Sequence, residues 1–205
     1  MVVHGLWMNG LESIVLRNRL ARAGFEPSVF RYPSTRGDIV EAGAALAAEL
    51  RSFDEVHLVG HSLGGLVILA ATESGHALPA GRVVLLGSPV QGSRVARTVA
   101  HWSIGLQLMG RLAAAELTRH DTRVWRSPRE LGIIAGSRSA GMGRLFAELP
   151  VPNDGTVCVD ETRLAGASEH IVLDVSHMGM LVSSPVATSV AEFLRTGRFS
   201  QQPKH

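Results

Sequence analysis

The chain has one cysteine, Cys158, which excludes an intramolecular disulfide and fits a reducing compartment. It has no apolar run close to the roughly 20 residues that a transmembrane helix needs. One cysteine and scattered histidines also give no zinc-ligand spacing. We therefore expect no disulfide, no membrane-spanning segment and no metal site.

Charge is nearly balanced. The formal net charge of +2 does not by itself indicate a nucleic-acid partner. Between Pro89 and Glu130, however, seven arginines stand against three acidic residues. Two interpretations of this stretch remain open: an ordinary solvated face, and a basic surface that attracts anionic lipid or an acidic substrate. The second interpretation implies peripheral lipid contact.

A basic leader is also missing, because the N-terminus enters a strand-like apolar segment at once. This absence predicts a cytoplasmic protein without a signal peptide. A length of 205 residues is enough for one well-buried core and short for two. We expect a single domain over residues 1–199 and a flexible tail over residues 200–205.

Strand-like apolar runs alternate with segments of helical periodicity, a pattern that predicts a parallel α/β sheet. The six expected strands are residues 1–4, 27–32, 55–60, 82–87, 131–136 and 170–175. Helical spacing is kept by Leu16, Leu20 and Ala23, by Ile39, Leu46, Leu50 and Phe53, and by Val186, Val190 and Phe193.

The most informative motif is Gly60-His61-Ser62-Leu63-Gly64, which lies between the apolar run 56–59 and the helix-like segment 65–71. This pattern is typical of a nucleophile elbow, a strand-to-helix turn in which glycines let both elements close around a strained serine. The alternative is an ordinary glycine-rich turn. The strand and helix context favours Ser62 as a catalytic nucleophile.

A serine hydroxyl is a weak nucleophile, so it needs a positioned base and an orienting acid. His177 follows the strand-like segment 171–175, and ligands gather at the C-terminal ends of strands in open parallel sheets. We expect His177 to be the base. The alternatives, His76, His170 and His205, are interpreted as surface histidines.

Asp154 is the expected acid, because it lies among turn-forming residues after the strand at 131–136 and before His177. Asp160 and Glu161 are competing carboxylates nearby. Asp174 is a third competitor, but the sequence predicts that it lies inside the final strand, where its side chain would point into a sheet face.

The N-terminal segment His4-Gly5-Leu6 reads as a turn at the end of a short buried strand. The backbone N–H of Leu6, together with that of Leu63, would form an oxyanion hole, the donor pair that stabilises a tetrahedral intermediate. We expect His4 to shape this loop rather than to act as a base.

Five motifs together resemble the small bacterial lipases and esterases of the alpha/beta-hydrolase superfamily and, more distantly, the lipase-like domain of glycosylphosphatidylinositol deacylases. They are His4-Gly5-Leu6, Gly60 to Gly65, Gly87 to Ser93, Asn153 to Val157, and Ser176-His177. The resemblance implies Ser62 as nucleophile, Asp154 as acid, His177 as base, and Leu6 and Leu63 as oxyanion donors. It implies a truncated alpha/beta-hydrolase fold, because the two N-terminal antiparallel strands of the full fold have no counterpart.

One position departs from the resemblance. Several larger bacterial lipases carry a calcium-binding aspartate two residues after the catalytic histidine, and this chain has Gly179 there. No calcium site is therefore carried over.

The stretch 89–130 is longer than a single crossover helix requires. One helical face carries Val95, Val99, Trp102, Leu106 and Met109. Two interpretations remain open: a crossover helix packed on the core, and a small cap over Ser62. In the second case we expect Trp7, Trp102 and Leu106 to contact an acyl chain.

These observations predict a serine hydrolase that cleaves a small-molecule or lipid carboxylic ester through an acyl-enzyme and needs no cofactor. A thioesterase or an acyltransferase could use the same residues. A hydrolase-fold binding module without catalysis is the alternative from a different class. The sequence does not indicate an oligomeric state.

Overall fold

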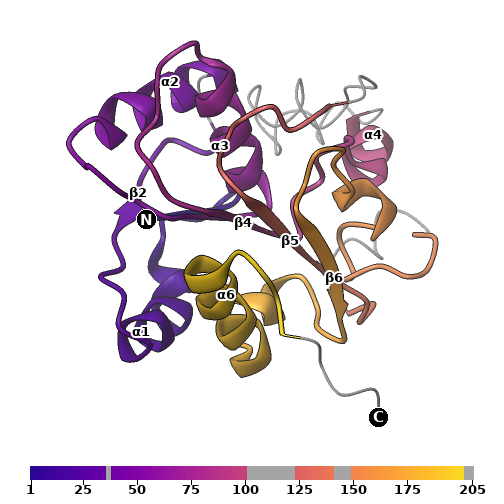
Figure 1. The fold of residues 1–205 in the computed structure, drawn as a ribbon. Helices are drawn as coiled ribbons and strands as arrows, with labels where there is room; N and C mark the ends of the chain where they lie inside the picture. The colour runs from indigo at the N-terminus through magenta and orange to yellow at the C-terminus, as the bar shows by residue number, and fades with distance from the viewer. Residues whose placement is uncertain (36–37, 101–122, 141–148, 201–205) are drawn as a thin grey trace.

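Parallel strands form one sheet through the centre of the molecule (Figure 1). The computed structural model describes residues 1–35, 38–100, 123–140 and 149–200. Within these residues the sheet has six strands in the order β2-β1-β3-β4-β5-β6, and all neighbouring pairs are parallel. The strands are β1 (Val2–Val3), β2 (Val29–Phe30), β3 (Leu58–His61), β4 (Val83–Leu86), β5 (Leu131–Gly136) and β6 (Glu169–Leu173). The predicted α/β fold is confirmed.

Alternate residues of the central strands face opposite sides of the sheet, as the two-residue period of a strand requires. In β4, Val83 and Leu85 belong to one buried cluster, whereas Val84 and Leu86 belong to the other. Both faces are therefore apolar and are covered by helices. Figure 1 shows α2 (Ile39–Leu50) and α3 (Leu63–Glu73) on one face, and α1 (Ile14–Arg22) and α6 (Ser184–Thr196) on the other.

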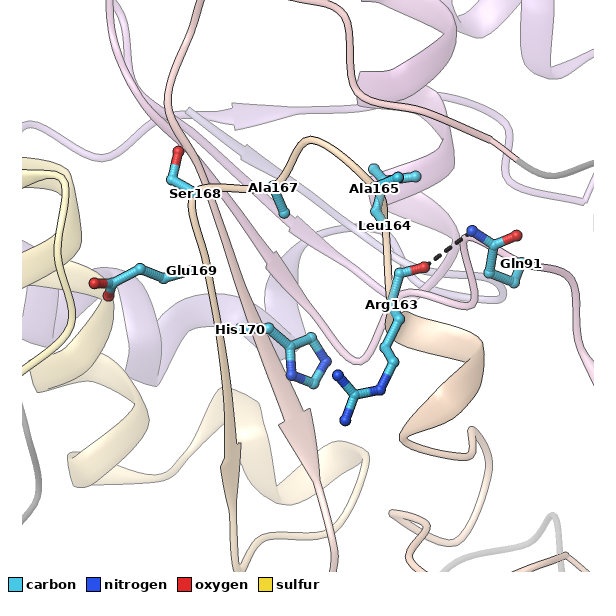
Figure 2. A pocket seen from close by; sticks show the side chains of 8 residues that line it. All are labelled: Gln91, Arg163, Leu164, Ala165, Ala167, Ser168, Glu169 and His170. Carbon is cyan, nitrogen blue, oxygen red and sulfur yellow. Dashed lines mark hydrogen bonds between the residues drawn. The ribbon is translucent and has the colours of Figure 1, made fainter.

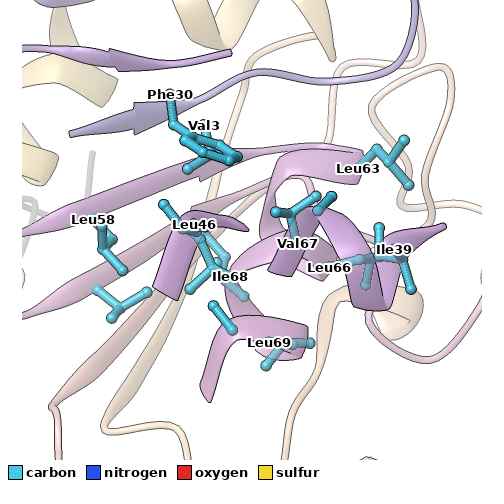
Figure 3. Close-up of a cluster of buried hydrophobic side chains, with 14 of the residues drawn as sticks. Val3, Phe30, Ile39, Leu46, Leu58, Leu63, Leu66, Val67, Ile68 and Leu69 are labelled. Atoms are coloured by element: carbon cyan, nitrogen blue, oxygen red, sulfur yellow. The ribbon is translucent and has the colours of Figure 1, made fainter. Parts of the chain in front are cut away.

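The face under α2 and α3 carries the larger of the two clusters, part of which is drawn in Figure 3. Leu46 of α2 and Ile68 of α3 meet Val3 and Leu58 of the sheet there. The two helices approach closely, because a Cβ atom on Gly43 would lie 2.6 Å from the Cβ of Ala70. This packing fixes α3, and with it the residues at the N-terminus of α3.

Helix ends follow ordinary capping chemistry. The side chain of Asp38 accepts a hydrogen bond from the N–H of Val40 at the start of α2, and Ser183 does the same for Val186 at the start of α6. α6 ends at Gly197, whose φ of 76° suits glycine. The prediction that Phe53 continues the α2 periodicity is wrong, because the helix ends at Leu50.

α4 (Arg94–Ala100) is the helix that the structure describes within the expected cap, 89–130. Ala96 is buried in the larger cluster and Val95 packs against it, so this part of the segment belongs to the core. Residues 101–122, which make up most of the expected cap, lie outside the described residues, as do 201–205 of the expected tail. No described helix is long and apolar enough to cross a membrane.

Glycines allow α3 to begin directly against the sheet. A Cβ atom on Gly64 would lie 2.2 Å from the carbonyl oxygen of Val3, and one on Gly65 would lie 2.1 Å from Oγ of Ser88. A Cβ on Gly60 would lie 2.7 Å from Cα of Gly65. A Cβ would meet backbone atoms at Gly60 and Gly64 and the side chain of Ser88 at Gly65. The start of α3 is therefore held between β1 and the residue that follows β4 and Gly87.

This close packing predicts a specific pattern of stability changes. Gly65→Ala should lower the free energy of unfolding by about 1–3 kcal/mol, because the new methyl group overlaps Ser88. Ser88→Gly in the same chain should recover part of the loss, which gives a coupling of about 1 kcal/mol or more in a double-mutant cycle. Urea denaturation of the four proteins measures both quantities, and additive changes would show that the overlap is relieved elsewhere.

Candidate active site

The residues that the sequence predicts as catalytic lie at the C-terminal edge of the sheet. β1 leads into His4, Gly5 and Leu6, β3 leads into Ser62, and β6 is followed by His177. Because all the strands are parallel, their C-terminal ends lie at the same edge. Asp154, from the loop between β5 and β6, meets His177 there.

Ser62 occupies a sharp turn between the end of β3 and the start of α3. Its φ of 54° and ψ of −123° lie in a region that residues with a side chain rarely adopt. The N–H of Ser62 donates to the carbonyl oxygen of Leu86 at 2.9 Å. Gly5 faces the serine, since a Cβ on Gly5 would lie 3.1 Å from Cβ of Ser62. The predicted strand–turn–helix context of Ser62 is therefore present.

His177 and Asp154 form a buried pair. Nδ1 of His177 donates to Oδ2 of Asp154 at 2.7 Å, and the exposed fractions of the two residues are 7% and 1%. The other carboxylate oxygen, Oδ1, accepts from the N–H groups of Thr156 at 2.9 Å and Val157 at 2.7 Å. Each oxygen thus has its own partners. When the imidazole is neutral, this arrangement leaves the lone pair of Nε2 unused by the pair.

Two glycines make room for this pair. A Cβ on Gly87, which has a φ of 53°, would lie 2.9 Å from Oδ2 of Asp154 and 3.1 Å from Nδ1 of His177. A Cβ on Gly136 would lie 2.7 Å from Cβ of Asp154. The sequence pattern does not place either glycine in the site. Gly87 opens one of the family-like motifs, which is the signal that could have identified it.

His61 connects the turn of Ser62 to the loop of His177. Its Nε2–H donates to the carbonyl oxygen of His177 at 3.1 Å, and the two ring centroids are 4.8 Å apart. Burial lowers the pKa of His61 to about 3, so the ring is neutral near pH 7. Its Nδ1 is buried and has no hydrogen-bond partner among the described residues. The sequence pattern does not indicate this role for His61, although the residue lies inside the serine motif.

His4 supports the loop that carries Leu6, as expected. Its ring stacks on Tyr32 with centroids 4.5 Å apart, and its Nδ1 donates to the carbonyl oxygen of Gly5 at 3.0 Å. Oη of Tyr32 donates to the carbonyl oxygen of His4 at 2.8 Å. Burial lowers the pKa of His4. At the start of α3, the N–H of Leu63 is one of the donors that a helix leaves without an intrahelical partner.

The remaining site predictions concern the hydroxyl of Ser62 and the residues expected to contact an acyl chain. Oγ of Ser62 has no hydrogen bond with any residue that the structure describes, His177 included. Trp7 is 58% exposed and has a φ of 58°. Trp102 and Leu106, the other expected acyl contacts, lie outside the described ranges.

The competing acids have other partners. Asp160 forms two hydrogen bonds with the guanidinium of Arg94, at 2.9 and 2.8 Å, and these bonds lower the pKa of Asp160. The prediction that Asp174 lies inside the last strand is wrong, because β6 ends at Leu173 and the N–H of Val175 turns back to the Leu173 carbonyl oxygen. The exposed Asp174 pairs with Arg138 at 2.6 Å, and this contact lowers its pKa.

Glu161, the remaining competing acid, is buried and braces the loop that carries Asp154. Its carboxylate accepts from the N–H of Cys158 at 2.8 Å and from the N–H of Arg94 at 2.6 Å. Burial raises the pKa of Glu161. The same carboxylate therefore joins the Asp154 loop to the first residue of α4.

His170 lies at the start of β6, at the opposite end of this strand from His177. Its Nε2 is hydrogen-bonded to Oγ1 of Thr162 at 2.9 Å. His170, Arg163 and Gln91 line an open pocket of about 490 Å³. Figure 2 shows the side chain of Arg163 next to His170, and Gln91 next to the backbone of Arg163. This pocket contains none of the predicted catalytic residues. Within the described part of the chain, no group of three or more His, Cys, Asp or Glu side chains could hold a metal ion.

Solved structures of other proteins share this fold. The lipase BlEst2 of Bacillus licheniformis, in its mature form, is 20% identical with a TM-score of 0.68, and the match covers 95% of this chain and 90% of that chain. A monoacylglycerol lipase of Paleococcus ferrophilus is 16% identical with a TM-score of 0.61, and the match covers 94% and 92%.

RedJ, a thioesterase of the prodiginine biosynthetic pathway in Streptomyces coelicolor, is 14% identical with a TM-score of 0.58, and the match covers 95% of this chain and 83% of that chain. A comparison with curated proteins found no match. A family model described as the alpha/beta hydrolase family matches residues 1–170, so the chain belongs to this family.

Proposed function

We propose that the protein is a serine hydrolase that cleaves carboxylic esters, with Ser62 as nucleophile, His177 as general base and Asp154 as orienting acid. Family membership supports a hydrolase activity. The observation that carries the proposal is the 2.7 Å hydrogen bond from His177 to Asp154, at the sheet edge where Ser62 has its strained backbone. The bond orients a base at the same sheet edge as the serine, and general-base activation of a serine requires an oriented base.

In the first step, Oγ of Ser62 attacks the ester carbonyl carbon while its proton moves to Nε2 of His177. Asp154 keeps Nδ1 protonated and stabilises the imidazolium that forms. Because Oδ1 is already held by two backbone N–H groups, the carboxylate cannot rotate away from the imidazole without losing those bonds. The absence of a bond between Ser62 and His177 is compatible with this role, since catalytic hydrogen bonds often tighten only when substrate is bound.

The negative charge of the tetrahedral intermediate falls on the former carbonyl oxygen. The N–H groups of Leu63 and Leu6 are the proposed donors to it. Leu63 lies at the N-terminus of α3, where the positive end of the helix dipole also stabilises a negatively charged oxygen. The close approach of Gly5 to Ser62 supports the placement of the Leu6 loop beside the same oxygen.

The intermediate collapses when the bond to the alcohol oxygen breaks and the leaving alkoxide takes the proton from Nε2 of His177. Water then attacks the acyl-enzyme on Ser62 with His177 again as base, and the acid product leaves. No cofactor takes part in these steps.

The ester class is supported by the likeness to a lipase and a monoacylglycerol lipase. The likeness to a thioesterase supports a second candidate, hydrolysis of acyl thioesters by the same residues. Matched oxygen and sulfur esters of one acyl chain separate the two candidates, because only the leaving group differs.

Replacement of the nucleophile is the first test of the proposal. Ser62→Ala should lower kcat for a p-nitrophenyl ester by about 10⁴- to 10⁶-fold, as the loss of a triad serine does in general. The melting temperature should not fall, since alanine keeps the packing of the turn. Retained ester hydrolysis in the variant would assign the activity to another residue.

A comparison of three carboxylates tests the acid. Asp154→Asn should lower kcat by about 10³- to 10⁴-fold, because the amide no longer holds His177 in the required tautomer. Asp160→Asn and Asp174→Asn, which only break exposed ion pairs, should leave kcat within about threefold. Steady-state kinetics compare kcat of the three variants at equal folded fraction. A larger loss of kcat in Asp160→Asn would assign the role of the acid to Asp160.

His61 is proposed as a positioning residue that acts through His177. Its Nε2–H reaches the carbonyl oxygen of His177, and the amide nitrogen of glutamine can take the place of Nε2, whereas that of asparagine is one bond too short. We expect His61→Gln to keep kcat within about threefold and His61→Asn to lower it about 10- to 100-fold with little change in KM. If both variants lose kcat equally, and the losses follow the fall in their melting temperatures, His61 has only a packing role.

A further inference from the structure

Exposed apolar side chains gather next to the candidate active site. The described residues include ten exposed large apolar side chains, and five of them lie in the two short segments 7–14 and 178–182. We name these five the rim patch. Its members and their exposed fractions are Trp7 (58%), Leu11 (59%), Ile14 (49%), Met178 (50%) and Val182 (52%).

The two segments lie over the same buried cluster, on one face of the sheet. Met8 and Leu16 on one side share a buried cluster with Met180 and Leu181 on the other. Nη1 of Arg19 donates to the carbonyl oxygen of Val182 and ties α1 directly to the second segment. The outward-facing side chains of the two segments therefore lie over a common core.

The rim patch borders the residues proposed to carry the chemistry. Met178 directly follows His177, the proposed base. Trp7 comes two residues after Gly5, which lies against Ser62. A molecule that covers the rim patch is thus held beside the residues proposed to carry the chemistry.

Positive charge follows the apolar side chains along α1. Arg17, Arg19 and Arg22 follow Ile14 by three to eight residues, which corresponds to about 5–12 Å at 1.5 Å per residue. Arg22 is exposed, whereas Arg17 and Arg19 are half-buried. Glu12 is the acidic residue of this stretch, and its carboxylate accepts hydrogen bonds from the N–H groups of Asn9 and Gly10. The rim patch therefore forms an apolar tip at the sheet edge. The three α1 arginines form a basic collar behind it.

This order matches the layers of an anionic lipid surface. Apolar side chains that enter such a surface reach about 5–10 Å into the boundary between headgroups and acyl chains, and cationic side chains at the depth of the collar meet the phosphates. A soluble acidic ligand would contact only the arginines, and a neutral apolar partner would contact only the rim patch. A patch of exposed apolar side chains next to an active site is the usual mark of an interaction surface.

We propose that the rim patch and the α1 arginines dock the protein onto an anionic phospholipid surface and present a lipid ester to Ser62. The docking step stands on the surface residues alone. Only its purpose, the delivery of an ester, rests on the proposed function. Lipid-bound substrate then reaches Ser62 without passing through water.

The test uses the full chain with Ser62→Ala, so that vesicles are not consumed. Sedimentation with vesicles of phosphatidylcholine alone, and with an added fraction of phosphatidylglycerol, measures the bound fraction. We expect binding to the anionic vesicles and a loss of binding at high salt. Leu11→Ser with Ile14→Ser, Met178→Ser and Val182→Ser should lower the partition coefficient by about tenfold or more.

A matched control carries Val40→Ser and Phe53→Ser, which replace exposed apolar side chains of other segments, and it should bind as the parent does. Arg17→Gln with Arg22→Gln keeps the apolar tip and should remove the preference for anionic vesicles. This second variant keeps the test valid if the fourfold variant does not fold by circular dichroism.

The proposal is overturned if the parent binds neither vesicle, or if the rim and arginine variants bind as the control does. It is also overturned if light scattering shows that the rim substitutions convert a dimer to a monomer, because the patch would then join two copies. Hydrolysis of a soluble ester by chains that retain Ser62 is measured separately. Failure of the proposed function therefore appears there and leaves the vesicle result unchanged.

Discussion

The strained backbone of Ser62 is the constraint from which the rest of the site follows. A residue with a side chain at φ 54° and ψ −123° costs of the order of 1–3 kcal/mol, and it persists only where the surroundings hold it. Gly60, Gly64 and Gly65 provide that hold, because their missing side chains let β3 and α3 close around the turn. The N–H of Ser62 is also bound to the carbonyl oxygen of Leu86 on the neighbouring strand. The serine is thereby lifted to the sheet edge, where loops from several strands can reach it.

Those loops are fixed by their own internal bonds rather than by contact with Ser62. Asp154 accepts two backbone N–H groups from its own turn on one oxygen and the His177 imidazole on the other. Glu161, buried nearby, braces the same loop through the N–H of Cys158. His61 joins the serine turn to the loop of His177 through the carbonyl oxygen of that residue. Such preorganisation is what electrostatic catalysis requires, since the groups need little rearrangement when charge develops.

The sequence was sufficient for the elements that depend on local pattern. The six strands, the helix after Ser62 and the pairing of His177 with Asp154 all follow from periodicity, turn residues and chain order. Contacts between distant residues leave no such pattern: the bond from His61 to the carbonyl oxygen of His177 joins residues 116 positions apart. The space that Gly87 leaves for the pair of Asp154 and His177 is of the same kind. The end of β6 was misjudged for a related reason, because a backbone turn after Leu173, and not a change of residue type, ends the strand.

The central claim is that Ser62 becomes a nucleophile through His177 and Asp154, and covalent labelling tests it most directly. The wild-type chain is treated with a fluorophosphonate, and tandem mass spectrometry then locates the modified residue. The account predicts one adduct per chain, on Oγ of Ser62, formed much faster than on any other serine. No adduct, or an adduct on a different side chain, would contradict it.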